Sequence, residues 1–100
     1  MIFSTVTASY GEAVVKQIDP TRRIKTRLYR DECTPVADNL HKDLTKLGRP
    51  MEDIILLEWC PYGNEKNSVP VSHWAGDKYD HELNSLTPIL TSMSEMRDVR

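Results

Sequence analysis

The chain has 100 residues, of which 39% are hydrophobic and 28% are charged, and its formal net charge is −2. This balance is typical of one small soluble domain, and the near-neutral charge argues against nucleic-acid binding, which requires a strongly basic face. No apolar run approaches the length of about 18 residues that a membrane span needs, and the first residues lack the basic and apolar regions of a secretory signal.

The chain has two cysteines, Cys33 and Cys60. Neither belongs to a Cys-x-x-Cys pair and no histidine pair lies near them, so the sequence does not predict a zinc site. A reducing compartment is the simplest interpretation. A single disulfide between the two remains the alternative.

The first elements are predicted to be a strand over Ile2–Val6 and then a helix. Ser9 and Glu12 have the spacing of a capping box at the helix start. Asp19-Pro20 ends the helix, because proline disfavours helical geometry in the residue before it. Five residues fall at helical spacing, and four of them are able to face the core: Tyr10, Ala13, Val14, Gln17 and Ile18.

The segment Arg22–Arg30 alternates between apolar and polar side chains, which predicts a half-exposed strand with a basic face. A solvated face balanced by Asp31 and Glu32 is the simplest interpretation. The alternative is a docking patch for an acidic partner. The candidate residues for such a patch are Arg22, Arg23, Lys25 and Arg27.

Thr34–Asn39 is expected to be a loop. Within Leu40–Gly48 a short helical turn is expected, with Leu44 and Leu47 facing inward and Gly48 as its C-cap. The apolar run Ile54–Leu57 does not alternate, so it is expected to be a strand buried on both faces, as in a parallel sheet.

Ser68–Val71 is expected to be extended, and a last helix follows, kinked at Pro88. Its apolar stripe consists of Leu83, Leu86, Leu90 and Met93. Strands that alternate with helices predict an α/β fold with a mainly parallel sheet.

Six segments follow one another in an order that resembles the haloacid-dehalogenase branch containing the RNA polymerase II C-terminal-domain phosphatases. They are IDP, RLYRDEC, KDLTKLGR, IILLEWCP, NSVPV and HWAGDKYDHEL. The same branch contains the presequence receptor of the mitochondrial inner-membrane translocase. The resemblance implies an incomplete Rossmann-like parallel sheet flanked by helices, which lacks the strand of the first motif. Residues 1–100 would form a single truncated phosphatase-like domain.

Active members of that superfamily use an Asp-x-Asp motif, a serine or threonine, a lysine and a polar pair that helps to hold Mg²⁺. These groups supply a nucleophile and compensate the charge of the transferred phosphoryl group. The resemblance places the serine at Ser4, the lysine at Lys42 and the polar pair at Glu58-Trp59. No Asp-x-Asp occurs in the chain, and an indole cannot serve as an oxygen ligand for Mg²⁺.

Ser4, Lys42 and Glu58 are therefore interpreted as vestiges, and no catalysis, metal or cofactor is expected. Each has a simpler structural interpretation. Ser4 would be a hydroxyl bonded to local backbone, Lys42 a surface lysine beside Asp43, and Glu58 a hydrogen-bonded acid at a strand end. Cys33, which matches a cysteine common in the family, is expected to be a small buried residue.

The end of the chain, with HWAGDKYDHEL and RDVR, resembles the translocase receptor more than the phosphatases. Trp74 is expected to cap the core, or alternatively to anchor a partner. This resemblance implies a place at the mitochondrial inner membrane, with the nucleus or cytoplasm as the alternative.

The leading hypothesis is a non-catalytic interaction or scaffold subunit in a multiprotein assembly. In this hypothesis another polypeptide completes the sheet next to Ile2–Val6 and Ile54–Leu57, because a missing central strand leaves their backbone groups unpaired. The runner-up is one half of a split or truncated Mg²⁺-dependent protein serine/threonine phosphatase.

Overall fold

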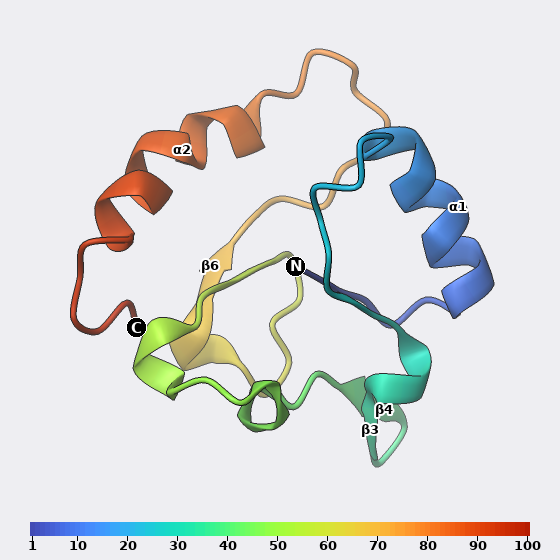
Figure 1. Cartoon of the computed structure of the whole chain (residues 1–100), viewed down its shortest axis with the longest axis horizontal. Helices are drawn as coiled ribbons and strands as arrows, with labels where there is room; N and C mark the ends of the chain where they lie inside the picture. Colours follow the sequence, from blue (N-terminus) through green and yellow to red (C-terminus); the bar gives the residue numbers. More distant parts are fainter. The chain divides into compact units, whose positions relative to one another are not determined.

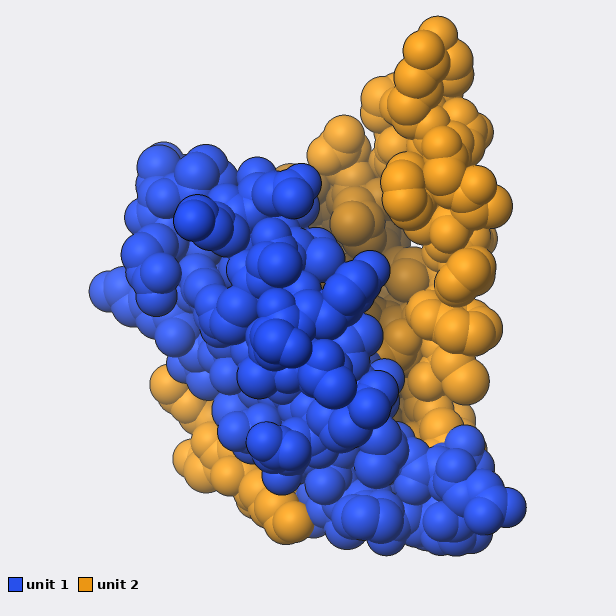
Figure 2. Space-filling model, turned by 90° about the vertical axis from the view of Figure 1, so that its right-hand side faces the viewer, with its two compact units in different colours: residues 1–43 blue, residues 44–100 orange.

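The computed structural model describes residues 1–100. The chain divides into two compact units, Met1–Asp43 and Leu44–Arg100 (Figure 2).

The first unit is built on a strand–helix–strand arrangement. Strand β1 (Ile2–Phe3) and strand β2 (Arg27–Leu28) pair in parallel, and helix α1 (Ala8–Ile18) connects them (Figure 1). The amide of Ile2 donates to the carbonyl of Thr26 at 3.0 Å. Parallel strands need such a crossover because a tight turn cannot connect them.

Both strands of this unit are shorter than the sequence predicts. The expected strand over Ile2–Val6 ends at Phe3, and the chain bends near Ser4, whose hydroxyl accepts a hydrogen bond from the amide of Val6 at 3.3 Å. The expected strand over Arg22–Arg30 keeps only Arg27–Leu28. Beyond β1 two backbone hydrogen bonds still connect the segments, from the amide of Ser4 to the carbonyl of Leu28 and from the amide of Arg30 to the carbonyl of Val6, both at 2.9 Å.

The start and the buried face of α1 differ from expectation. The helix begins at Ala8, and the amide of Gly11 donates to the carbonyl of Thr7 at 2.9 Å, so the predicted capping box at Ser9 and Glu12 does not form. The buried residues of the helix are Gly11 and Val15. The predicted core-facing residues Tyr10, Val14 and Ile18 are instead 63%, 41% and 65% exposed, and Ala13 and Gln17 are exposed as well.

The end of α1 agrees with the sequence. The helix ends at Ile18, and Asp19 caps it through its amide, which donates to the carbonyl of Val15 at 2.8 Å. The carboxylate of Asp19 then accepts hydrogen bonds from the amides of Arg23, at 2.9 Å, and Ile24, at 2.7 Å. These bonds fix the turn that follows Pro20 and keep it out of the β2 ladder.

The segment expected to be a loop at Thr34–Asn39 forms a β-hairpin. Strand β3 (Thr34–Val36) pairs antiparallel with β4 (Asn39–His41), and Thr34 lies opposite His41. Ala37 closes the turn with a φ of 54°. A hairpin of two three-residue strands with a proline in one of them has too weak a sequence signal to be predicted.

The second unit begins as the sequence predicts. A 3₁₀ helix covers Leu44–Leu47, Leu44 is only 2% exposed, and Gly48 follows with a φ of +71°. Glycine adopts this left-handed geometry without steric cost. A second 3₁₀ helix covers Met51–Asp53.

A second parallel pair forms the sheet of this unit. Strand β5 (Leu56–Glu58) pairs with β6 (Ser68–Pro70), with Leu57 opposite Val69. The strand starts two residues later than expected because Ile54 closes the preceding 3₁₀ helix. Its residues are half-buried, so the prediction of burial on both faces is wrong for β5 in this structure.

One buried side chain links β6 to the segment before β5. The side-chain amide nitrogen of Asn67 donates to the carbonyls of Met51, at 2.8 Å, and Ile54, at 2.9 Å. Asn67 is only 4% exposed. Two backbone carbonyls that leave water on folding are therefore satisfied by one amide.

The last helix, α2 (Glu82–Met93), runs through Pro88. Of its predicted stripe, Leu86, Leu90 and Met93 are half-buried, whereas Leu83 is 62% exposed. No helix of the chain has the length and apolar character required to cross a membrane.

The two parallel pairs and the two α-helices confirm the predicted fold class, an incomplete α/β domain. The pair β1–β2 and the pair β5–β6 are separate two-stranded sheets. The assignment of residues 1–100 to a single domain stays a prediction.

Candidate functional site

Ser4, the predicted serine of a phosphoryl site, lies directly after β1. Its amide donates to the carbonyl of Leu28 at 2.9 Å, which holds the end of β1 against β2. Its hydroxyl accepts a hydrogen bond from the amide of Val6. Such a local bond is the simpler of the two roles expected for this side chain.

Cys33 contacts the backbone carbonyl of Ser4 and lies within the electrostatic reach of Lys42. The Cys33 thiol is buried and donates to the carbonyls of Ser4 and Tyr29, both at 3.6 Å. Burial raises the pKa of this thiol, and the positive charge of Lys42 acts against that rise. The prediction that Cys33 is a small buried residue is confirmed.

The third predicted vestige, Glu58, ends strand β5 in the second unit. Its carboxylate accepts a hydrogen bond from the amide of Trp59 at 3.1 Å. The indole of Trp59 is 58% exposed and meets the ring of His73 edge-on, with the ring centres 4.6 Å apart. A lone carboxylate beside an indole does not fit Mg²⁺, which takes oxygen ligands in a near-octahedral arrangement.

No other cluster in the chain replaces these ligands. No three histidine, cysteine, aspartate or glutamate side chains come together in a way that could hold a metal ion. Both cysteines are free thiols, Cys33 buried and Cys60 exposed.

The four predicted partner-binding cations do not share one environment. Arg22, Arg23 and Lys25 are exposed. The side chain of Arg27, in contrast, is only 8% exposed and lies 2.8 Å from the carboxylate of Glu12 and 3.7 Å from that of Asp19. Arg27 therefore ties β2 to α1 and is not part of a basic outer face.

This polar network was missed in the sequence analysis. Glu12 also accepts a hydrogen bond from the hydroxyl of Tyr29 at 3.2 Å. Burial, together with the negative charge of Glu12, raises the pKa of Tyr29. A signal was available, because Glu12 is the acidic residue of a helix connected to a strand that begins with Arg27.

The network borders a cavity of about 480 Å³ in the first unit. Charged side chains of both signs line it: Glu12, Lys16, Asp19, Arg22 and Arg27. Bonds from two backbone amides, those of Ile24 and Arg23, hold the pKa of Asp19 below its ordinary value, and the charges of Arg27 and Arg22 add to this effect.

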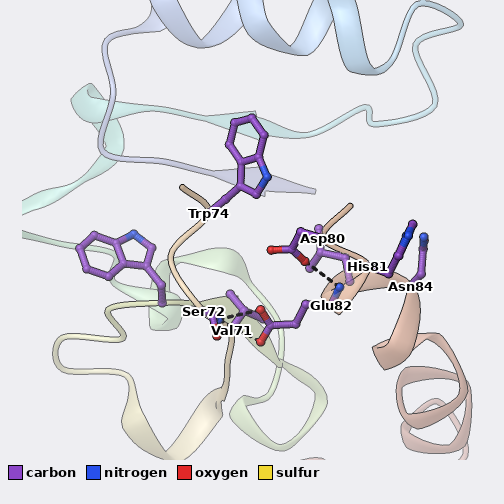
Figure 3. Close-up of a pocket in the computed structure, with 9 residues that line it drawn as sticks. Val71, Ser72, Trp74, Asp80, His81, Glu82 and Asn84 are labelled. Carbon is purple, nitrogen blue, oxygen red and sulfur yellow. Dashed lines mark hydrogen bonds between the residues drawn. The ribbon is translucent and has the colours of Figure 1, made fainter. Parts of the chain in front are cut away.

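Trp74, the predicted core cap or partner anchor, borders an open cavity of about 540 Å³ in the second unit. It is 63% exposed, so the prediction that it caps the core is wrong, and its role as an anchor stays a prediction. Its indole nitrogen donates to the carbonyl of Asp77 at 2.9 Å. Figure 3 shows that the carboxylate of Glu82 turns toward the backbone of Ser72. The amide of Ser72 donates to both carboxylate oxygens, at 2.9 and 3.0 Å.

Strands β1 and β5 each have one neighbour in their sheets. The amides of Ile2 and Ser4 point toward β2. Because backbone groups alternate along a strand, those of Phe3 point to the opposite edge. On the side of β6, the carbonyl of Glu58 accepts a hydrogen bond from the amide of Val71 at 3.1 Å. The same alternation places the backbone groups of Leu57 on the edge away from β6.

Comparisons with known proteins identify the family of this fold. The sequence matches the NLI interacting factor-like phosphatases over residues 1–100. It is 37% identical over 103 residues to the "CTD small phosphatase-like protein 2" of Dictyostelium discoideum, covering 100% of this chain and 18% of that protein. It is 30% identical over 102 residues to the human "Carboxy-terminal domain RNA polymerase II polypeptide A small phosphatase 1", covering 99% of this chain and 39% of that protein.

A third relative, the "Probable C-terminal domain small phosphatase" of Dictyostelium discoideum, is 33% identical over 103 residues, with 100% of this chain and 34% of that protein covered. The chain thus spans between 18% and 39% of the length of these three proteins. The resemblance to the phosphatase-like branch, first inferred from six short segments, is confirmed. The chain belongs to the family of NLI interacting factor-like phosphatases.

Proposed function

We propose that this chain is a non-catalytic protein-interaction module with a phosphatase-type fold. The observation that carries the proposal is that β1 and β5, the first strands of the two parallel pairs, each have one unoccupied edge. The sequence supports it, because residues 1–100 contain no Asp-x-Asp and Trp59 stands beside the one acid, Glu58, at the end of β5.

The partner in this proposal is an extended segment of another polypeptide that pairs with the edges of β1 and β5. The backbone groups of Phe3 and Leu57 would then gain partners. A buried backbone group that stays unpaired costs roughly 1 to 3 kcal/mol, which is a large share of the roughly 5 to 15 kcal/mol that holds a small domain together. Strand addition is a common way to satisfy such an edge.

Two exposed features are candidates for further contacts with the same or another partner. Arg22, Arg23 and Lys25 form a short basic segment that suits an acidic surface. The exposed indole of Trp74 borders a cavity and is the kind of side chain that anchors protein interfaces.

The test is to isolate the chain with its bound proteins and then to remove them. We expect the isolated chain to unfold without a sharp transition and to associate through its edges. Addition of the copurified partner should restore a cooperative transition. A soluble monomer that unfolds sharply without any partner would contradict the proposal.

A second candidate is one half of a Mg²⁺-dependent phosphatase. The relatives carry phosphatase names, and Ser4 and Lys42 lie around the same buried thiol. The test is to co-express the chain with the preceding part of a relative that contains the Asp-x-Asp motif. Turnover of an aryl phosphate by the pair, but by neither piece alone, would favour this candidate over the non-catalytic one.

The finer assignment to the translocase-receptor branch, and with it a location at the mitochondrial inner membrane, also stays a proposal. Its support is the W-x-G-D and D-V-R sequence at Trp74–Asp77 and Asp98–Arg100. Cell fractionation with an antibody to the chain tests it, and a signal confined to the nucleus or cytoplasm would contradict it.

A further inference from the structure

We propose that one flank of helix α1, formed by Tyr10, Val14 and Ile18, receives the side chains of an extended, uncharged apolar segment that pairs with the free edge of β1. This inference rests on the proposed function, because it names the chemistry of the partner at that edge. It begins from the exposure of the three side chains, which are 63%, 41% and 65% exposed.

The contacts of α1 define its orientation. Gly11 and Val15 are buried, and the backbone of Gly11 lies against the ring of Tyr29. Glu12 contacts Arg27 of β2. Successive residues of a helix are about 100° apart, since 3.6 residues complete a turn. The flank of Glu12 therefore lies on the β2 side of the helix.

The flank of Tyr10, Val14 and Ile18 lies on the other side of the buried line of Gly11 and Val15. Each of the three is four residues from the next, so they form one row along the helix. The sheet of this unit has only two strands, and β2 lies on the side of Glu12. The row is therefore positioned beyond β1, over the space next to its free edge.

The spacing of the row matches that of a strand. Residues four apart along a helix are separated by about 6 Å, at 1.5 Å per residue. Side chains on one face of a strand recur every two residues, about 6.6 Å apart. A helix that connects two parallel strands runs back along them. Three alternate residues of a five-residue strand can thus each contact one residue of the row.

The row also defines the polarity of its occupant. Tyr10, Val14 and Ile18 carry no charge, whereas Glu12 and Lys16, the charged residues of α1, lie on the flank toward β2 and line the cavity there. A charged side chain placed against the row would lose water without gaining a partner. The residues of the added strand that face α1 are therefore apolar and uncharged.

The experiment uses the full chain and a lysine-flanked peptide with the core Val-Thr-Val-Thr-Val, which presents three valines on one face. Two control peptides accompany it. The first has the same composition in the order Val-Val-Thr-Thr-Val, and the second has N-methyl groups on every amide of the core, which block pairing along both edges. Binding is measured by fluorescence anisotropy.

Val14→Asp places a charge on the row, and Ala13→Asp places the same charge at an exposed position of α1 outside the row, beside the charged cavity of the first unit. We expect Val14→Asp to weaken binding of the alternating peptide by about tenfold or more and Ala13→Asp to change it by less than about twofold. If Val14→Asp reduces the helical circular dichroism signal, peptide binding is measured instead with Tyr10→Ser and Ile18→Ser, which should also weaken it. Tyr10 and Ile18 are mostly exposed, so their replacement leaves the folded unit intact.

The outcomes separate this inference from the proposed function. If N-methylation abolishes binding but Val14→Asp, Tyr10→Ser and Ile18→Ser behave like Ala13→Asp, the edge binds a strand and the role of the row is wrong. If the N-methylated peptide binds equally well, strand addition itself is wrong. A dimer of the chain that Val14→Asp dissociates would assign the row to a second copy and overturn the proposed occupant.

Discussion

The ring of Tyr29 packs directly against the backbone of Gly11, in the position that a side chain at residue 11 would occupy. A Cβ built on Gly11 overlaps the Tyr29 ring. Tyr29 is 5% exposed, and its hydroxyl donates to Glu12 on the next position of the same helix. One aromatic side chain thus fixes both the distance and the rotation of α1 relative to the β1–β2 pair.

Gly11→Ala should therefore destabilise the first unit. In an ordinary helix interior this change stabilises by about 1 kcal/mol, but here the added methyl group must displace a buried ring, which typically costs about 1 to 3 kcal/mol. The measurement is the hydrogen-exchange protection of the α1 amides. In a Tyr29→Leu background the same change should lose its penalty, and a penalty that persists would contradict the packing explanation.

Arg27→Met should lower the urea midpoint of the chain in complex with its copurified partner more than Glu12→Gln does. Methionine keeps the apolar stem but removes the cation that contacts the carboxylates of Glu12 and Asp19. Glu12→Gln removes one charge from a side chain that is 49% exposed, so water compensates for part of the loss. Equal effects of the two variants would show that the burial of Arg27 is unimportant.

The stability of the first unit should fall in acid through Asp19. Its folded-state pKa lies below the ordinary value of 3.8, chiefly because its carboxylate accepts hydrogen bonds from the backbone amides of Ile24 and Arg23. A lowered pKa adds stability that is complete above the unfolded-state pKa and is lost as the pH falls through the folded-state pKa. Asp19→Asn should be less stable at pH 7 and show a shallower loss between pH 5 and about pH 2. The check is the urea midpoint of both proteins, each in complex with the copurified partner, across this range, and parallel curves would show that Asp19 is not the cause of the loss.

The positions at which helices end were predictable from this sequence, whereas the orientation of α1 was not. Asp19-Pro20 ends the helix and Gly48 ends a 3₁₀ helix through local geometry, which the sequence carries directly. The buried side of α1 depends on Tyr29, a residue far along the chain, and on the lack of a side chain at Gly11. Periodicity counts apolar residues and therefore gave weight to Tyr10 and Ile18.

The candidate site was predictable in its residue types and less so in its environments. The family resemblance implied the position of Ser4 at a strand end, which β1 confirms, whereas strand β4 before Lys42 was not predicted. Alternation alone placed Arg27 on a basic outer face, whereas two carboxylates of the α1 segment draw it inward. Such a pairing depends on tertiary contacts that a strand pattern does not encode.

Trp59→Asn should not give the isolated chain phosphatase activity. Asparagine would return an amide oxygen next to Glu58, but the chain still has no Asp-x-Asp to attack phosphorus. The assay is hydrolysis of an aryl phosphate with excess Mg²⁺. Turnover in the unmodified chain that disappears in Lys42→Ala would overturn the non-catalytic proposal.

Cys60 should react with iodoacetamide at pH 8 at least about tenfold faster than Cys33 in the folded chain, because thiolate content and access control the rate. Cys60 is exposed, whereas burial raises the pKa of the Cys33 thiol and covers it. Mass spectrometry of tryptic peptides measures both rates. In 8 M urea, the control condition, the two rates should converge. Equal labelling without urea would show that the first unit is not folded as described.

The amide of Asn67 makes the second unit dependent on one uncharged donor group. Its nitrogen donates to the carbonyls of Met51 and Ile54, so both of its protons face oxygen atoms. Deamidation would replace that nitrogen with a carboxylate oxygen and set like partial charges against each other in a buried position. Aspartate at this position would therefore weaken the link between β6 and the segment that precedes β5.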